Sequence, residues 1–216
     1  WFSNGIHHHY GCEKFVPGFT PEFFKQALLS VDAATLPLAE GQTVEQLYEE
    51  VAPVIFDPKV MPKRVNQAAG EDLVLTSACN YYDGVTQQEA EAFYSAMKDP
   101  KDETPVSYGL NSRLVKENGK IQEKVWKVGG LYGAAIGKIV YWLKKAEGVA
   151  ENPEQKAVIA KLIEFYETGD LKTFDDYAIL WVKDLDSRID FVNGFTESYG
   201  DPLGMKASWE SLVNFK

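Results

Sequence analysis

The sequence has 216 residues, of which 45% are hydrophobic and 25% charged, a composition typical of folded globular proteins that excludes disorder as the default state. With 32 acidic and 22 basic side chains, the formal net charge is −10. Nucleic acids and anionic membranes need a basic protein surface, so this charge argues against both as the main partner and favours a cationic or neutral ligand. No apolar run approaches the roughly 18 residues of a membrane span.

Cysteine and histidine are scarce. Cys12 and Cys79 lie far apart and form no CxxC pair, which predicts reduced thiols and a cytoplasmic protein rather than a disulfide framework. The only histidines are His7, His8 and His9. Neighbouring side chains point in different directions, so three in a row do not readily converge on a metal ion. Lining a loop or cleft, or an ordinary structural role, stays open for them.

The two ends of the chain have no signature of natural termini. The chain begins at Trp1 without an initiator Met and ends at Lys216, directly after the apolar Leu212 and Val213. No signal peptide is visible. We expect that both ends are cut positions within a longer protein.

Capping residues predict helices in the first half of the chain. Thr20 before Pro21 predicts a helix to about residue 30, and Thr86 with Glu89 predicts one to Met97. A further helix is expected from Thr43 through Val51, until Pro53 and Pro58 interfere. Between these helices, the apolar and partly β-branched run 73–79 predicts a strand.

The second half contains a predicted hairpin, three helices and two final strands. Asn118-Gly119 lies between alternating runs at 106–116 and 121–127, the signature of a type I′ hairpin. This hairpin and the hairpin formed by the two final strands are both antiparallel and do not fit βαβ units, so the predicted class is α+β. The helices are expected at 131–147, from Asn152 to Gly169 and at 171–182, and the final strands at 189–199 and 205–213, joined by the turn 200–204.

The candidate binding residues are concentrated near the end of the chain. On a strand, Glu197 and Tyr199 would lie on one face, two residues apart. A carboxylate next to a phenol can bind an ammonium group and donate a hydrogen bond to a carbonyl, and the N-terminal end of a peptide presents both. Glu210 could return alongside them across the turn. The same pattern also suits a solvent-exposed strand face followed by a turn at Asp201-Pro202.

The sequence resembles one known family over essentially its whole length. Motifs at both ends resemble the bacterial branch of the zinc-dependent dipeptidyl peptidase III family: Ser3-Asn4-Gly5 to Tyr10-Gly11, Lys14 to Pro17, and Asn193 to Gly204 with Trp209-Glu210. The resemblance implies a two-lobed enzyme, with zinc held by HExxGH in a helical lobe and a five-stranded β-barrel in the other lobe. This chain contains no HExxGH. Residues 1–216 are therefore expected to form a single lobe with an antiparallel, barrel-like sheet and several packed helices.

The resemblance also implies a reaction and roles for three residues. In the parent enzyme, zinc-activated water releases N-terminal dipeptides from oligopeptides. Glu197 corresponds to the glutamate that binds the free ammonium of the substrate, Tyr199 to the catalytic tyrosine near the scissile carbonyl, and Glu210 to a further cleft glutamate. The fragment itself is expected to bind no zinc and to be inactive without the zinc lobe. A non-cleaving module for peptide N-termini and a purely structural domain remain the alternatives.

Two positions depart from the family pattern. Lys206 stands where many members have arginine, and lysine cannot form the bidentate fork that arginine forms with a carboxylate. Gly200 replaces what is often another arginine. The resemblance therefore transfers no ion pairing to this segment, and it transfers no role to the histidine run.

Overall fold

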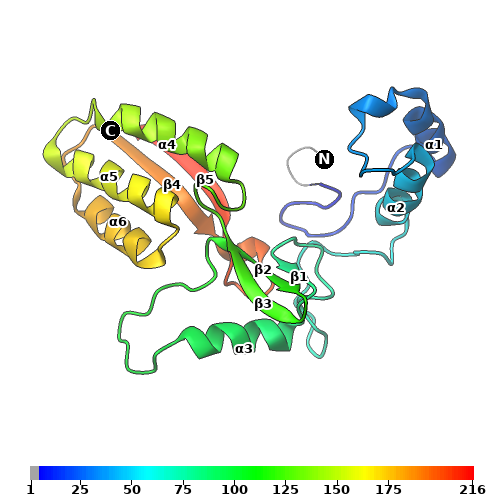
Figure 1. Cartoon of the computed structure of the whole chain (residues 1–216), viewed down its shortest axis with the longest axis horizontal. Helices are drawn as coiled ribbons and strands as arrows, with labels where there is room; N and C mark the ends of the chain where they lie inside the picture. Colours follow the sequence, from blue (N-terminus) through cyan, green and yellow to red (C-terminus); the bar gives the residue numbers. More distant parts are fainter. Residues whose placement is uncertain (1–4) are drawn as a thin grey trace. The chain divides into compact units, whose positions relative to one another are not determined.

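The structure, a computed structural model, describes residues 5–216, so Ser3 and Asn4 of the opening motif lie outside the described residues. The chain divides into two compact units. The first contains the residues up to Glu71 together with Thr76–Ala78, and the second contains Asp72–Leu75 and Cys79–Lys216. The helices α1 and α2 belong to the first unit, and the other labelled elements of Figure 1 belong to the second. The prediction of a single lobe stays a prediction.

Capped helices form the regular part of the first unit. α1 (Pro21–Ser30) begins as predicted, with the Thr20 hydroxyl accepting a hydrogen bond from the backbone of Phe23. α2 (Val44–Phe56) begins with a reciprocal capping box between Thr43 and Gln46. A short 3₁₀ helix, Ala33–Thr35, lies between them in the sequence.

The prediction that Pro53 ends the second helix was wrong, because α2 continues through it to Phe56. Proline removes one backbone donor from a helix but leaves its own carbonyl available, and the Asp57 N–H binds the Pro53 carbonyl at 2.9 Å. The ring of Phe56 also packs 5.9 Å from the rings of Phe19 and Phe24. This aromatic packing keeps the last turn of α2 in place.

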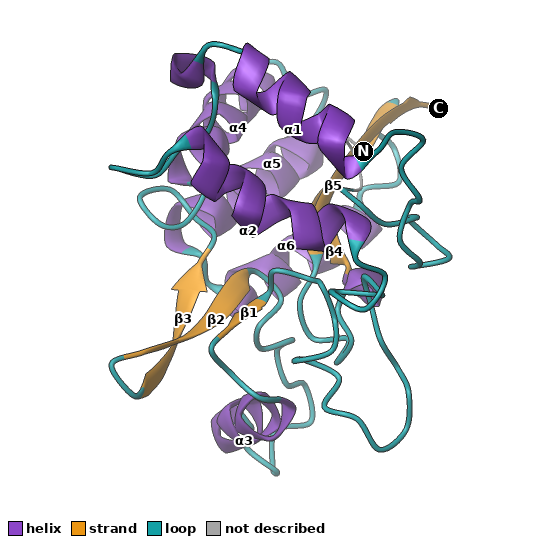
Figure 2. Ribbon diagram, turned by 90° about the vertical axis from the view of Figure 1, so that its right-hand side faces the viewer, coloured by secondary structure: helices purple, strands orange, loops and turns teal. Residues whose placement is uncertain are grey.

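A three-stranded sheet and one helix make up one part of the second unit. The strands lie in the order β1 (Tyr82–Asp83), β2 (Ser112–Glu117) and β3 (Lys120–Val125), with β1 parallel and β3 antiparallel to β2 (Figure 2). The hairpin prediction is confirmed: Asn118 and Gly119 have φ angles of 51° and 75°, as a type I′ turn requires. The helix α3 (Gln87–Met97) buries Ala90 and Tyr94 in the core that includes Leu114 of β2.

The strand predicted at 73–79 is absent, because residues 73–76 form a turn. The carboxylate of Asp72 accepts hydrogen bonds from the backbone of Val74, Leu75 and Gln87, at 3.0, 2.9 and 3.0 Å. An aspartate that binds backbone donors two and three residues ahead offers them a partner other than a sheet. This local bonding prevails over the β-propensity of the apolar run.

Three helices and a hairpin make up the other part of the second unit, and Figure 1 shows the helices gathered beside the hairpin. These elements are α4 (Gly133–Glu147), α5 (Pro153–Thr168), α6 (Leu171–Lys183), β4 (Ile189–Glu197) and β5 (Ser208–Phe215). α5 is the central helix, since seven of its side chains are buried and six of these belong to the shared hydrophobic core. α4 begins two residues later than predicted, after Tyr132 with its left-handed φ of 60°.

The α+β class is confirmed, but the expected barrel-like antiparallel sheet is not found within residues 5–216. The strands there form two separate small sheets, one of which contains a parallel pair, and they enclose no barrel. The final hairpin is nevertheless antiparallel, with β4 and β5 paired from Ile189 and Phe215 to Glu197 and Ser208.

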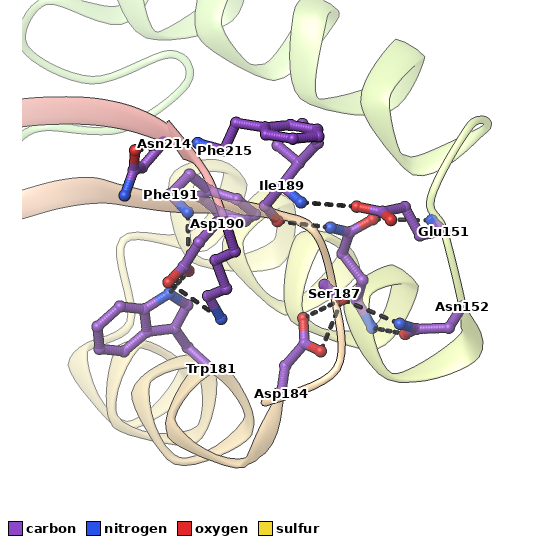
Figure 3. A network of polar contacts seen from close by, with 12 residues as sticks. Glu151, Asn152, Trp181, Asp184, Ser187, Ile189, Asp190, Phe191, Asn214 and Phe215 are labelled. Atoms are coloured by element: carbon purple, nitrogen blue, oxygen red, sulfur yellow. Dashed lines mark hydrogen bonds and ion pairs between the residues drawn. The ribbon is translucent and has the colours of Figure 1, made fainter.

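A polar network fixes the beginning of β4 (Figure 3). The Glu151 carboxylate accepts hydrogen bonds from the backbone of Ile189 at 2.7 Å and from the Arg188 side chain at 2.9 Å. The buried Gln155 side chain donates to the Ile189 carbonyl at 2.9 Å. The bond from Ile189, supported by Arg188, lowers the pKa of Glu151 to about 2.

This network predicts a pH-dependent contribution to stability. A carboxyl group with a depressed native pKa stabilises the fold above its ordinary pKa of 4.5, and the contribution is lost as the pH falls through about 2. We expect Glu151→Gln to lower the Tm at pH 7, and the difference from the original chain to disappear between pH 4.5 and 2. Thermal unfolding followed by circular dichroism, with Glu154→Gln as control, measures this; an equal difference at pH 7 and pH 2 would contradict it.

Candidate active-site carboxylates

Glu197 and Glu210 lie on the paired strands of the final hairpin, near a break in the strand register. Gly194 pairs with Glu210, and Phe195 pairs with Trp209. The next pair is Glu197 with Ser208, so Thr196 is an extra residue on β4. A β-bulge of this kind places two residues of one strand opposite one residue of the other.

The bulge determines which way Glu197 points. In a regular strand, Glu197 would share a face with Phe195, whose ring is buried in the core at 5% exposure. The extra residue instead places Glu197 opposite Ser208, which shares a face with Glu210 two residues further along β5. The bulge therefore turns Glu197 out of the core and toward Glu210.

The two carboxyl groups are in contact. The Glu197 carboxyl shares a hydrogen bond with that of Glu210, and this bond is the main cause that raises the pKa of Glu197 above its ordinary value. Partial burial and the negative charge of Glu210 act in the same direction. Two carboxyl groups in contact can share one proton, and the same arrangement can accept hydrogen bonds from one positively charged group.

Tyr199 lies beyond the end of the strand, and the argument that it shares a strand face with Glu197 was wrong. β4 ends at Glu197, and Tyr199 lies in a 3₁₀ turn, Ser198–Gly200. Its side chain is 49% exposed. The turn, rather than strand alternation, sets the direction of the phenol.

A buried aspartate closes the connection between β4 and β5. The carboxylate of Asp201 accepts hydrogen bonds from the backbone of Met205 and Lys206, both at 2.8 Å. It also accepts one from the Tyr82 hydroxyl of β1 at 2.9 Å. Burial and this neighbouring carboxylate raise the pKa of Tyr82. The connection is thereby folded on itself and fixed to the three-stranded sheet.

Lys206 is fully buried beside this aspartate. Its ammonium donates to the Tyr94 hydroxyl at 2.6 Å, and to the carbonyl and hydroxyl of Ser112 at 3.1 and 3.2 Å. Burial lowers the pKa of Lys206 to about 8, and the negative charges of Glu123 and Asp201 oppose this shift. Sequence reasoning identified Lys206 only as a departure from arginine. Acceptors on three residues, Tyr94, Ser112 and Gly109, suit a compact ammonium better than a planar fork.

A second set of hydrogen bonds fixes both strands beside Glu210. The indole N–H of Trp209 donates to the buried Tyr166 hydroxyl of α5 at 2.8 Å, and this hydroxyl donates to the Asn193 side chain at 2.5 Å. Asn193 and Trp209 flank the pair formed by Gly194 and Glu210. One tyrosine thus holds the register on both strands.

The histidines have structural surroundings. His7 is buried, and its Nε2 donates to the Met61 carbonyl at 2.8 Å, while the ring of His8 packs 4.1 Å from that of Phe15. Cys12 and Cys79 are not joined by a disulfide. Among the residues from 5 onward, no three His, Cys, Asp or Glu side chains are grouped so that they could hold a metal ion. The described side chains therefore do not fit the zinc that the family resemblance implies.

The chain matches one family over two thirds of its length. The model of peptidase family M49 aligns with residues 73–216, a range that contains the bulge, the carboxyl pair and the buried lysine. The chain belongs to peptidase family M49. The resemblance to the dipeptidyl peptidase III family recognised in the sequence is thereby confirmed.

Named relatives in the M49 family agree. The chain is 24% identical to dipeptidyl peptidase 3 of Nematostella vectensis over 239 residues, covering 97% of this chain and 32% of that protein. It is 31% identical to human dipeptidyl peptidase 3 over 84 residues, covering 39% of this chain and 11% of the human protein. The chain thus spans at most about a third of the length of these relatives.

Two solved structures of dipeptidyl peptidase III share the fold of this chain. DPP III from Caldithrix abyssi aligns with a TM-score of 0.51 and 19% identity, covering 90% of this chain and 34% of that one. Dipeptidyl-peptidase III from Corallococcus sp. strain EGB aligns with a TM-score of 0.50 and 18% identity, over the same shares of the two chains.

In the described part of the chain, no helix combines the length and apolarity needed to cross a membrane.

The contact between the carboxyl groups is directly measurable. We expect the carboxyl ¹³C signal of Glu197 to titrate above the ordinary glutamate pKa of 4.5, and Glu210→Gln to lower this midpoint because it removes the competing carboxyl. Glu164→Gln, which changes an exposed carboxyl of α5, serves as control. Titration of Glu197 at an unchanged midpoint in Glu210→Gln would show that the groups do not interact.

Proposed function

We propose that the chain is the substrate-binding lobe, residues 1–216, of a dipeptidyl peptidase III that releases N-terminal dipeptides from oligopeptides. Glu197 and Glu210 bind the free ammonium of the peptide, and Tyr199 donates a hydrogen bond near the scissile carbonyl. The observation that carries the proposal is the contact of the two carboxyl groups across the bulged hairpin.

The chemistry of the pair suits a peptide N-terminus. An α-amino group has a pKa of about 8, so it is mostly protonated at neutral pH. An ammonium has three donors, and two adjacent carboxyl groups can accept from two of them in charge-assisted hydrogen bonds. Binding the free end of the peptide fixes how far the scissile bond lies from it, which is what release of a dipeptide requires.

In this proposal the parent enzyme is a cytoplasmic metallopeptidase whose zinc is bound by the separate zinc lobe of the same protein. The substrate lies along the lobe described here, which contributes the peptide-binding side chains and no metal ligand. Neither nucleic acid nor membrane is a partner, in keeping with the net charge of −10.

A non-catalytic module that binds peptide N-termini is the second candidate. The contact between the two carboxyl groups favours it as well, since such a pair can bind an ammonium group without taking part in peptide cleavage. The downstream reading frame separates the two candidates: HExxGH within the following residues supports the peptidase, and its absence supports the module.

The roles of the site residues predict distinct kinetic effects in the full-length protein. Glu197→Gln removes one charge-assisted hydrogen-bond partner of the substrate ammonium, so it should raise KM for a dipeptidyl-arylamide by about 10-fold or more. Tyr199→Phe should mainly lower kcat, because its hydroxyl acts near the reacting carbonyl. Steady-state kinetics with Glu164→Gln as control tests both; wild-type kinetics in Glu197→Gln would refute the assignment.

The chain by itself is expected to bind no zinc tightly and to cleave no dipeptidyl-arylamide. Metal analysis of a chelated and reconstituted sample, together with an activity assay, measures both properties. Stoichiometric zinc in the reconstituted chain would contradict the division of roles between the two lobes.

A further inference from the structure

Glu197, Tyr199 and Glu210 all depend on one connection, the segment from Ser198 to Ala207 that joins β4 to β5. Tyr199 lies within it, and the two glutamates lie on either side of it. The 3₁₀ turn at its beginning is closed by a backbone bond of 3.0 Å from the Asp201 N–H to the Ser198 carbonyl. The geometry of the carboxyl pair therefore depends on what holds this segment.

The segment is held from within the core of the second unit. Asp201 lies four residues after Glu197, and Lys206 lies four residues before Glu210; both side chains are buried. Asp201 binds the Tyr82 hydroxyl of β1, and Lys206 reaches Tyr94 of α3 and Ser112 of β2.

The backbone continues this attachment at the beginning of β5. The N–H of the buried Ala207 donates to the Leu110 carbonyl at 3.0 Å. Contacts from side chains and backbone thus hold the segment at Asp201, Lys206 and Ala207. These three residues lie between Glu197 and Glu210 in the sequence, so they hold the stretch of chain that joins the two carboxyl groups.

The ammonium of Lys206 is the centre of this attachment. The elements packed against Lys206 each direct a group toward its ammonium. These groups are the Tyr82 and Tyr94 rings, 5.4 and 4.8 Å from Nζ, and the carboxylates of Glu123 and Asp201. Glu123 is bound to the Tyr94 hydroxyl at 2.9 Å and to Ser112. Removing the ammonium would leave these carboxylates and the Ser112 carbonyl without their cation, a costly state inside a protein.

We propose that Lys206, together with Asp201, is a positioning residue that keeps Glu197 and Glu210 in contact. Lys206 acts through the connection between β4 and β5 and does not itself touch the peptide. The positioning of the carboxyl pair stands on the structure alone, whereas its effect on peptide cleavage rests on the proposed function.

The direct test is the titration of the Glu197 carboxyl in Lys206→Met. Loss of the contact with Glu210 would lower the midpoint toward the ordinary value, whereas loss of a nearby positive charge alone would raise it further. The inference therefore expects a fall in Lys206→Met and a smaller fall in Lys206→Arg, which keeps the charge but fits the acceptors of Lys206 less well. An unchanged or higher midpoint in Lys206→Met would overturn it.

A matched control separates positioning from general loss of stability. Gln155→Met also removes a buried polar anchor of the hairpin, but at the opposite end of β4, where Gln155 binds Ile189. It should lower the Tm and leave the Glu197 midpoint in place. A fall of the midpoint as large as in Lys206→Met would reduce the proposed role to stability and overturn it.

A milder variant keeps the test decisive if Lys206→Met does not fold. Tyr94→Phe removes the hydroxyl that Lys206 and Glu123 both bind and keeps the ring in the core. It should lower the Glu197 midpoint by a smaller amount. A folded Tyr94→Phe chain with an unchanged midpoint would count against the inference.

Kinetics of the full-length protein distinguishes this inference from the proposed function. At equal fractions of folded protein, the KM of Lys206→Met should be about 10-fold or more above that of Gln155→Met. If the wild-type protein cleaves no peptide but the midpoint falls in Lys206→Met, the proposed function fails and the positioning stands. If the protein cleaves peptides and Lys206→Met leaves both KM and midpoint unchanged, the positioning fails alone.

Discussion

The second unit is organised around a buried ammonium group that needs acceptors from several directions. Lys206 finds them on α3 and β2, and the neighbouring Asp201 finds its donor on β1. A desolvated charge of this kind is tolerated only where every partner is in place. The three-stranded sheet and the connection of the final hairpin are consequently tied together by hydrogen bonds as well as by apolar packing, such as that of Leu203 and Met205.

The carboxyl pair lies outside this core but depends on it. Tyr166 holds the register of β4 and β5 from the side of α5, and the Lys206 attachment holds the connection beyond the bulge. Two like carboxyl groups in contact repel each other once both are ionised. A rigid support on both sides of the pair is the physical means of keeping them together.

Local rules predicted the elements whose determinants lie within a few residues. Thr20, Thr43 and Thr86 marked helix starts, and Asn118-Gly119 marked the hairpin, because capping and turn chemistry are local. The strand expected at 73–79 failed, because the decisive partner was a side-chain carboxylate next to the run. The bulge and the burial of Lys206 were not foreseeable, since strand register and core position depend on residues far apart in the sequence. Glu197 and Glu210 were proposed from the residue pattern of the final strands and from motif resemblance, whereas their contact is a property of the fold.

Because of the bulge at Thr196, the contact between Glu197 and Glu210 depends on strand register as well as on the identity of the two residues. Side chains alternate between the two faces of a strand. In a regular pair of strands, two side chains therefore share a face only if both lie an even number, or both an odd number, of positions from the same pair of opposing residues. Without the bulge, a regular ladder continued from Phe195 and Trp209 would pair Glu197 with Ala207 and direct the two glutamates to opposite faces of the hairpin. Aligning the acidic positions alone would therefore overstate how widely the pair is shared, because the strand register between them must be kept as well.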